Sequence, residues 1–148
     1  MKVLLRFALI AGIAIGLIAI AVQLALHSYL TTLATCVDRE LATKLSPDGA
    51  RQAIVFERSC GATSDFNTQV SLLPAGTRLP NQPGNVFILD SNHGAAPQRP
   101  GSGPPVSIKW VSNDSLEISY DERAHVIIQN RHVGAVRIGY LFLHRHGA

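Results

Sequence analysis

Charged residues are scarce in this sequence: Asp, Glu, Lys and Arg make up 16% of its 148 residues. Of the 13 Lys and Arg residues, Lys2 and Arg6 precede a hydrophobic run, which leaves 11 basic against 10 acidic residues in the rest of the chain. The sequence has no block of like charge, no heptad pattern and no long internal repeat. A nearly neutral domain with scattered arginines offers no surface for phosphates, which argues against nucleic acid as a partner.

The motifs of common enzyme classes are also missing. The sequence contains neither Gly-x-Ser-x-Gly nor Ser-x-x-Lys, and no glycine-rich phosphate loop precedes a helix. Its six histidines are not placed at a recognised metal-ligand spacing. We therefore expect no catalytic residue, no cofactor and no metal ligand. The weak candidates for binding are Asp90 and His93, which lie close together in a polar loop.

Only two cysteines are present, Cys36 and Cys60. Both follow the hydrophobic run near the N-terminus, so they would lie on the same side of a membrane that this run crosses. Two such cysteines usually pair in an oxidising compartment. Closing a loop of about 23 residues contributes on the order of 3 kcal/mol to stability. We therefore predict a Cys36–Cys60 disulfide. The alternative is that Cys60 is a nucleophile, because Gly61 follows it and histidines occur elsewhere in the chain.

One long hydrophobic run lies near the N-terminus, from Phe7 to Leu26, with Gln23 as its polar side chain. About 20 helical residues span about 30 Å, the thickness of the hydrocarbon core of a bilayer. Lys2 and Arg6 precede the run and no Lys or Arg follows it directly, so the N-terminus should stay in the cytoplasm. We predict a cytoplasmic segment at 1–6, a transmembrane anchor at 7–29 and a juxtamembrane linker at 30–40.

Two other fates of this segment stay open. A signal peptide would be cleaved, although its apolar core usually runs for only 7–15 residues. Lipidation of Cys36 would follow a lipobox, although Thr35 is bulky for that position and Cys36 lies about ten residues beyond the run. Ala8, Gly12 and Gly16 form a small-xxx-small stripe, which predicts a homodimer through Gly12 and Gly16 unless the small residues merely reflect the composition of membrane helices.

Residues 41–148 have the alternation and turn residues of an all-β domain. Pro47, Asp48 and Gly49 predict a tight turn between strands at 41–45 and 51–58. Val106–Tyr120 reads as a second hairpin, because apolar and polar residues alternate on both sides of a short polar connection. We expect an antiparallel meander, as an open sheet or a small two-sheet sandwich of about seven or eight strands, with a long flexible loop at 90–105.

Several short motifs follow one another between Cys36 and Tyr140: SPDG at 46–49, CGAT at 60–63, Phe66, TQVS at 68–71 and GNVFI at 84–88. In order and spacing they resemble an uncharacterised family of small bacterial membrane-anchored or lipoprotein-type envelope proteins. The resemblance implies a tethered extracytoplasmic β domain, and it carries no known activity to this chain.

These observations predict a bacterial protein of the inner (cytoplasmic) membrane, with its β domain in the periplasm or outside. We expect a non-catalytic protein-interaction or envelope accessory module. Its partners would be the membrane and another envelope protein, bound through a sheet edge or the 90–105 loop. The alternative is a small envelope enzyme or metal-dependent binder that uses Cys60 or His93.

Overall fold

The computed structural model describes residues 2–33, 36–61, 66–98 and 100–143, and within the helix it describes the side chains of residues 6, 10 and 12–28. Part of the CGAT motif, Ala62 and Thr63, lies outside the described residues. The chain forms two compact units, one ending at Thr35 and one beginning at Cys36.

The first unit is a single helix, α1, which runs from Lys2 to Leu33. Its described apolar side chains are exposed; Ile10, for example, is 63% exposed and Leu26 is 55% exposed. The predicted helix over residues 7–29 is therefore confirmed. Across the part of the chain that the structure describes, however, no helix combines the length and the apolar character that crossing a membrane requires. The transmembrane role predicted for residues 7–29 is thus not supported.

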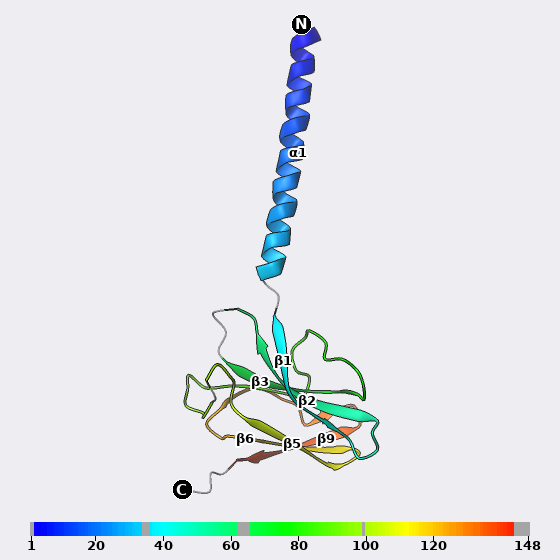
Figure 1. Cartoon of the computed structure of the whole chain (residues 1–148), viewed down its shortest axis with the longest axis vertical. Helices are drawn as coiled ribbons and strands as arrows, with labels where there is room; N and C mark the ends of the chain where they lie inside the picture. The colour runs from blue at the N-terminus through cyan, green and yellow to red at the C-terminus, as the bar shows by residue number, and fades with distance from the viewer. Residues whose placement is uncertain (1, 34–35, 62–65, 99, 144–148) are drawn as a thin grey trace. The chain divides into compact units, whose positions relative to one another are not determined.

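The second unit is built from strands, as predicted. The described residues contain nine of them: β1 (Val37–Leu45), β2 (Arg51–Ser59), β3 (Asn67–Pro74), β4 (Phe87–Asp90), β5 (Val106–Ser112), β6 (Ser115–Tyr120), β7 (His125–Gln129), β8 (His132–Val133) and β9 (Val136–Phe142). One sheet has the order β1-β2-β3-β4-β7 and the other has the order β5-β6-β9-β8. Figure 1 labels β1, β2 and β3 of the first sheet and β5, β6 and β9 of the second. The number of strands in the described residues therefore exceeds the predicted seven or eight.

Both predicted hairpins are present. β1 and β2 pair around the turn at Ser46–Gly49, where Gly49 N–H donates to the Ser46 carbonyl at 2.8 Å and Gly49 has a φ of 69°. β5 and β6 form the second hairpin. β1 begins at Val37, inside the region 30–40 that the sequence predicts to be a linker.

The predicted antiparallel meander is wrong for β7, which pairs with β4 and not with its sequence neighbour β6, and for the last strand. β9 pairs with β6 in parallel, from Ser115 opposite Arg137 to Tyr120 opposite Phe142. β9 can lie parallel to β6 because β7 belongs to the first sheet, where it pairs with β4, and separates β6 from β9 along the chain. β8 and β9 then belong to the second sheet again. Alternation along each strand is the same for parallel and antiparallel neighbours, so the sequence pattern could not distinguish them.

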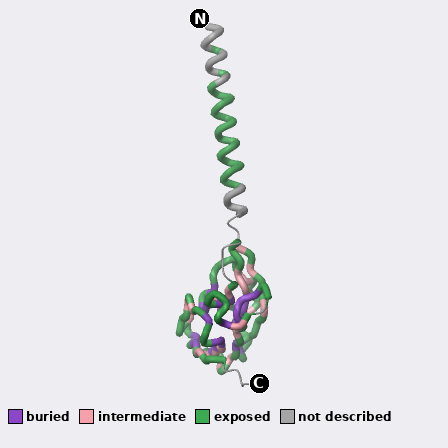
Figure 2. The backbone as a smooth tube through the Cα atoms, turned by 90° about the vertical axis from the view of Figure 1, so that its left-hand side faces the viewer, coloured by how far each residue is buried: buried purple, intermediate pink, exposed green. Residues whose placement is uncertain are grey.

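The two sheets share one hydrophobic core. Figure 2 shows buried residues gathered in the middle of the second unit. Ala53, Val55 and Val70 come from the first sheet, and Leu116 and Ile118 come from the second.

The first sheet is also covered on its other face. Five consecutive residues of β2, 52–56, are buried, so both faces of that strand are shielded from water. The segment 75–86 provides the second cover. Gln52 donates to the Thr77 carbonyl and accepts from Gly76 N–H, and Gln69 accepts from Gly84 N–H at 2.7 Å. Buried glutamines in β2 and β3 are satisfied in this way, as buried polar groups must be.

Candidate functional site

A disulfide closes the open end of the β1–β2 hairpin. Cys36 and Cys60 are joined by an S–S bond of 2.05 Å, and their Cα atoms lie 4.1 Å apart. They stand directly beyond the pair Val37–Ser59, at the end of the hairpin opposite the Ser46–Gly49 turn. The predicted pairing is therefore present. Cys60 has no free thiol in this state, so the alternative role as a nucleophile gains no support.

A β-bulge between Glu40 and Ala42 sets which side chains meet next to this disulfide. If the register next to the turn continued unchanged, Arg39 would lie opposite Arg58, and Glu40 opposite Glu57. The bulge shifts the pairing by one residue, so that Arg39 lies opposite Glu57 and Asp38 lies opposite Arg58. Two pairs of like charge are thereby replaced by two pairs of opposite charge, which stabilise a sheet when directly opposed.

The two ion pairs lie on opposite faces of the hairpin, because neighbouring residues of a strand point to opposite sides. Arg58 Nη1 contacts both carboxylate oxygens of Asp38, at 2.8 and 2.7 Å, and each side chain is 10% exposed. Arg58 also donates to the Asn81 carbonyl at 3.4 Å, which places this pair beneath the segment 75–86. The pair Asp38–Arg58 is therefore a largely buried structural contact.

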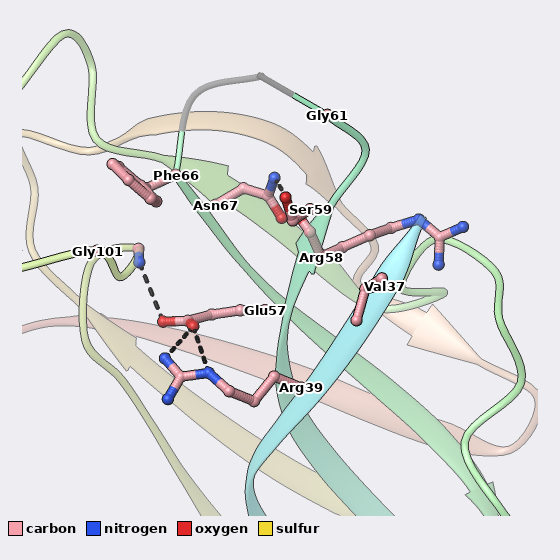
Figure 3. Close-up of a pocket in the computed structure, with 10 residues that line it drawn as sticks. Val37, Arg39, Glu57, Arg58, Ser59, Gly61, Phe66, Asn67 and Gly101 are labelled. Carbon is pink, nitrogen blue, oxygen red and sulfur yellow. Dashed lines mark hydrogen bonds and ion pairs between the residues drawn. The ribbon is translucent and has the colours of Figure 1, made fainter. Parts of the chain in front are cut away.

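The other pair, Arg39 and Glu57, lies in a pocket of about 520 Å³ (Figure 3). The pocket is built from the disulfide end of β1 and β2, the start of β3, and the glycine-rich end of the 90–105 loop. Its described lining residues are Val37, Arg39, Glu57, Arg58, Ser59, Gly61, Phe66, Asn67, Gly101 and Gly103. Figure 3 shows Phe66 and Val37 on either side of Glu57 in that view.

Glu57 is the most constrained group in the pocket, with a side chain 12% exposed. One carboxylate oxygen accepts hydrogen bonds from Ser102 Oγ and from Gly103 N–H, the latter at 3.1 Å. The other accepts from Nε of Arg39 at 3.1 Å and from Nη2 of the same residue. Burial raises the pKa of Glu57, but the hydrogen bonds from Ser102, Arg39 and Gly103 outweigh it, so the pKa lies below its ordinary value. A carboxylate with four donors is poorly placed to accept a further proton, so Glu57 organises the pocket.

The end of the 90–105 loop is held against β3. Thr68 Oγ1 donates to the Pro104 carbonyl at 2.7 Å, and Ser102, Gly103 and Pro104 are buried. A Cβ atom at Gly103 would lie 2.5 Å from the carbonyl carbon of Asn67, so only glycine fits there. The flexibility predicted for residues 90–105 stays a prediction, and these contacts show which part of the segment forms the pocket wall.

The two weak binding candidates are not in the pocket. Asp90 contacts Nδ1 of His125 at 3.1 Å and accepts from Asn92 N–H at 2.8 Å. His93 is exposed in a turn with a φ of 55°. Within the described ranges, no three His, Cys, Asp or Glu side chains are grouped so that they could hold a metal ion.

Sequence reasoning missed Arg39, Glu57, Phe66 and Gly103 as pocket residues. A signal for the first two was present in the sequence. The turn alone sets Leu45 opposite Gln52, a register that would bring Cys36 opposite Gly61 and leave the two cysteines out of line. A disulfide together with this turn therefore requires one extra residue in β1, and hence the pairing of Arg39 with Glu57.

No protein-family model matches the chain, and neither the curated proteins nor the solved structures contain a significant match to it. The resemblance to small bacterial envelope proteins therefore stays a prediction.

Replacing Glu57 by glutamine should destabilise the domain. The amide would bring its own N–H groups toward the donors of Arg39 or Ser102. We expect a loss of about 1.5 kcal/mol, the lower end for hydrogen bonds to charged groups, because Arg39 is largely exposed. Since the pKa of Glu57 is lowered on folding, its contribution should be complete above pH 4.5, the ordinary pKa, and lost as the pH falls below it.

Urea unfolding of the wild type and Glu57→Gln between pH 7 and pH 3 measures this difference directly. The two stabilities should converge at acid pH. The matched control is Glu122→Gln, an exposed glutamate in a turn, which should stay within about 0.5 kcal/mol of the wild type. A constant difference at all pH values would contradict the assigned role of the Glu57 charge.

Proposed function

We propose that the β domain is a non-catalytic interaction module that binds another protein at the disulfide end of β1. The observation that carries this proposal is the combination of an edge strand with a pocket beside it. β1 is the terminal strand of its sheet, and exposed edges are the usual sites at which sheets acquire partners. Val37 and Phe66 supply exposed apolar groups at the pocket, since the two residues are 68% and 48% exposed. Arg39 supplies an exposed charge there, because its side chain is 63% exposed.

The proposed compartment is extracytoplasmic, in the bacterial envelope. The Cys36–Cys60 disulfide supports this, because such bonds persist in oxidising compartments and are rare in the cytosol. Association of α1 with the membrane belongs to the same proposal, since its described residues from 12 to 28 are all exposed and mostly apolar. Recovery of the full chain from the soluble fraction of lysed bacteria would contradict that association.

Site-specific photocrosslinking in bacterial cells tests the interaction. A photoreactive amino acid placed at Val37, at the pocket, should give a discrete crosslinked protein. The same amino acid at Val111 is the matched control, because Val111 is also an exposed valine on a strand, 60% exposed against 68%, but belongs to β5 in the other sheet. Equal crosslinking at both positions, or none at either, would overturn an interaction site at this end of β1.

A further inference from the structure

The outer edge of β1 offers backbone hydrogen-bonding groups over a short and definable stretch. In an antiparallel ladder, opposite residues alternate between pairs that exchange hydrogen bonds and more closely spaced pairs that do not. The Cα atoms of Cys36 and Cys60 are only 4.1 Å apart, so these two residues form a pair without direct backbone hydrogen bonds. By alternation, Val37 and Arg39 bond to β2, whereas the N–H and C=O groups of Asp38 and Glu40 point away from it. In agreement, the Cys36 carbonyl accepts from Nδ2 of Asn81, which lies outside the sheet, at 2.9 Å.

Both ends of this stretch are closed. Asn81 occupies the Cys36 carbonyl, and the bulge between Glu40 and Ala42 interrupts regular pairing on the far side. What remains for a further strand is the segment 37–40, with Asp38 and Glu40 as its backbone partners. A segment of this length suits one extended peptide. It is too short for a stable interface between two copies of β1, which needs about 1,200 Å² or more.

The side chains beside this edge select a chemistry. Val37 and Arg39 project on the same face, toward the pocket, because they are two residues apart. Arg58 is bound to Asp38, so Arg39 is the lining arginine with an exposed guanidinium. Arg39 uses Nε and Nη2 for Glu57, and its exposed side can meet an anion. Val37, with Phe66 on the pocket lining, favours an apolar group.

We propose that the segment 37–40 binds an extended segment of a partner protein by strand addition, with an acidic residue opposite Arg39 and an apolar residue opposite Val37. An added antiparallel strand meets Arg39 before Val37, so the partner segment reads acidic–x–apolar from its N-terminus. Main-chain hydrogen bonds to Asp38 and Glu40 hold the segment, and the two side chains on the pocket face give specificity. The inference rests on the proposed function and names the partner chemistry of the same site.

The test begins with random peptides displayed on phage and selected on the full chain purified in mild detergent with its disulfide intact. We expect enrichment of Asp or Glu two positions before an aliphatic or aromatic residue. No enrichment of this spacing would overturn the proposal.

Substitutions in β1 then test the mode of binding of an enriched peptide. Glu40→Pro removes an outward N–H that β2 does not use, and proline is tolerated on edge strands. We expect it to weaken binding by about tenfold or more, whereas Glu40→Ala, which keeps the N–H, should change it by less than about twofold. Thermal unfolding of both variants establishes that the domain remains folded. Equal binding by the two variants would exclude strand addition at this edge.

A charge exchange tests the side-chain contact. Arg39→Glu should weaken the binding of an acidic–x–apolar peptide. The variant should bind again when the acidic residue of the peptide is replaced by lysine. A peptide that binds Arg39→Glu and the wild type equally would contradict the assigned pairing. If the full chain is instead a dimer that Glu40→Pro dissociates, the occupant of the edge is a second copy and the proposed partner is wrong.

The two proposals fail in different ways. If crosslinking at Val37 persists in the Glu40→Pro variant, the interaction module is supported and strand addition is contradicted. If β1 binds peptides but no protein is crosslinked in cells, strand addition at this edge is supported and the proposed cellular function is contradicted.

Discussion

Replacing Phe87 by alanine is expected to lower the free energy of unfolding by about 3–5 kcal/mol, the range for truncating a buried aromatic side chain. Phe87 is fully buried, and it belongs to β4 of the first sheet. Its ring lies 4.9 Å from that of Tyr120 in β6 and 5.2 Å from that of Tyr140 in β9, measured between centroids. Phe87 therefore joins the two sheets, and its loss leaves a cavity between them.

The matched control is Phe142→Ala. Phe142 also contacts Tyr120, at 5.4 Å, but it is 52% exposed, so its removal creates no enclosed cavity. We expect a cost of less than about 1 kcal/mol for this exposed ring. Urea unfolding followed by far-UV circular dichroism gives both values. Similar losses for the two variants would mean that Phe87 does not hold the sheets together as the packing indicates.

Removal of the disulfide is the second large change. The double variant Cys36→Ala/Cys60→Ala should lose about 3 kcal/mol, because the bond closes a loop across a sequence separation of 24 residues. This is a large share of the 5–15 kcal/mol that typically stabilises a domain. The local consequence should be larger than the global one, since the bond ties the start of an edge strand to β2.

Hydrogen exchange distinguishes the local effect. Without the bond, amide protection at residues 37 and 39, whose N–H groups bond to β2, should fall to a greater extent than protection in the central strand β3. The wild type treated with a reductant should reproduce the double variant, and the double variant should not respond to the reductant. If protection at 37 and 39 is unchanged, the disulfide is not what holds the start of β1 against β2.

Local sequence signals were sufficient for the hairpins and for the cysteine pair. Pro47, Asp48 and Gly49 specify a turn through fixed or permitted φ values, and the structure places a turn there with Gly49 at positive φ. The indole N–H of Trp110 needs a hydrogen-bond acceptor, and it donates to the Lys44 carbonyl at 3.0 Å. These features depend on residues that are close in sequence or on the chemistry of one side chain.

The pocket could not be predicted in the same way. It requires Glu57 of β2, Phe66 before β3 and Gly103 before β5 to meet, and nothing in their local sequence indicates that contact. The 90–105 segment reads as a loop by composition. Residues 102–104 are nevertheless buried, because Gly103 fits directly against the backbone of Asn67.

The sequence by itself therefore determined the helical first unit, the strand periods and the turn at Ser46–Gly49, because short-range periodicity and turn chemistry encode them. It also determined the Cys36–Cys60 pair, because two cysteines allow a single pairing within the chain. The tertiary structure alone decided that β9 runs parallel to β6 and that segment 75–86 covers the second face of the first sheet. These depend on which strands become neighbours, and alternating side chains can satisfy several neighbours equally well until the whole core is packed.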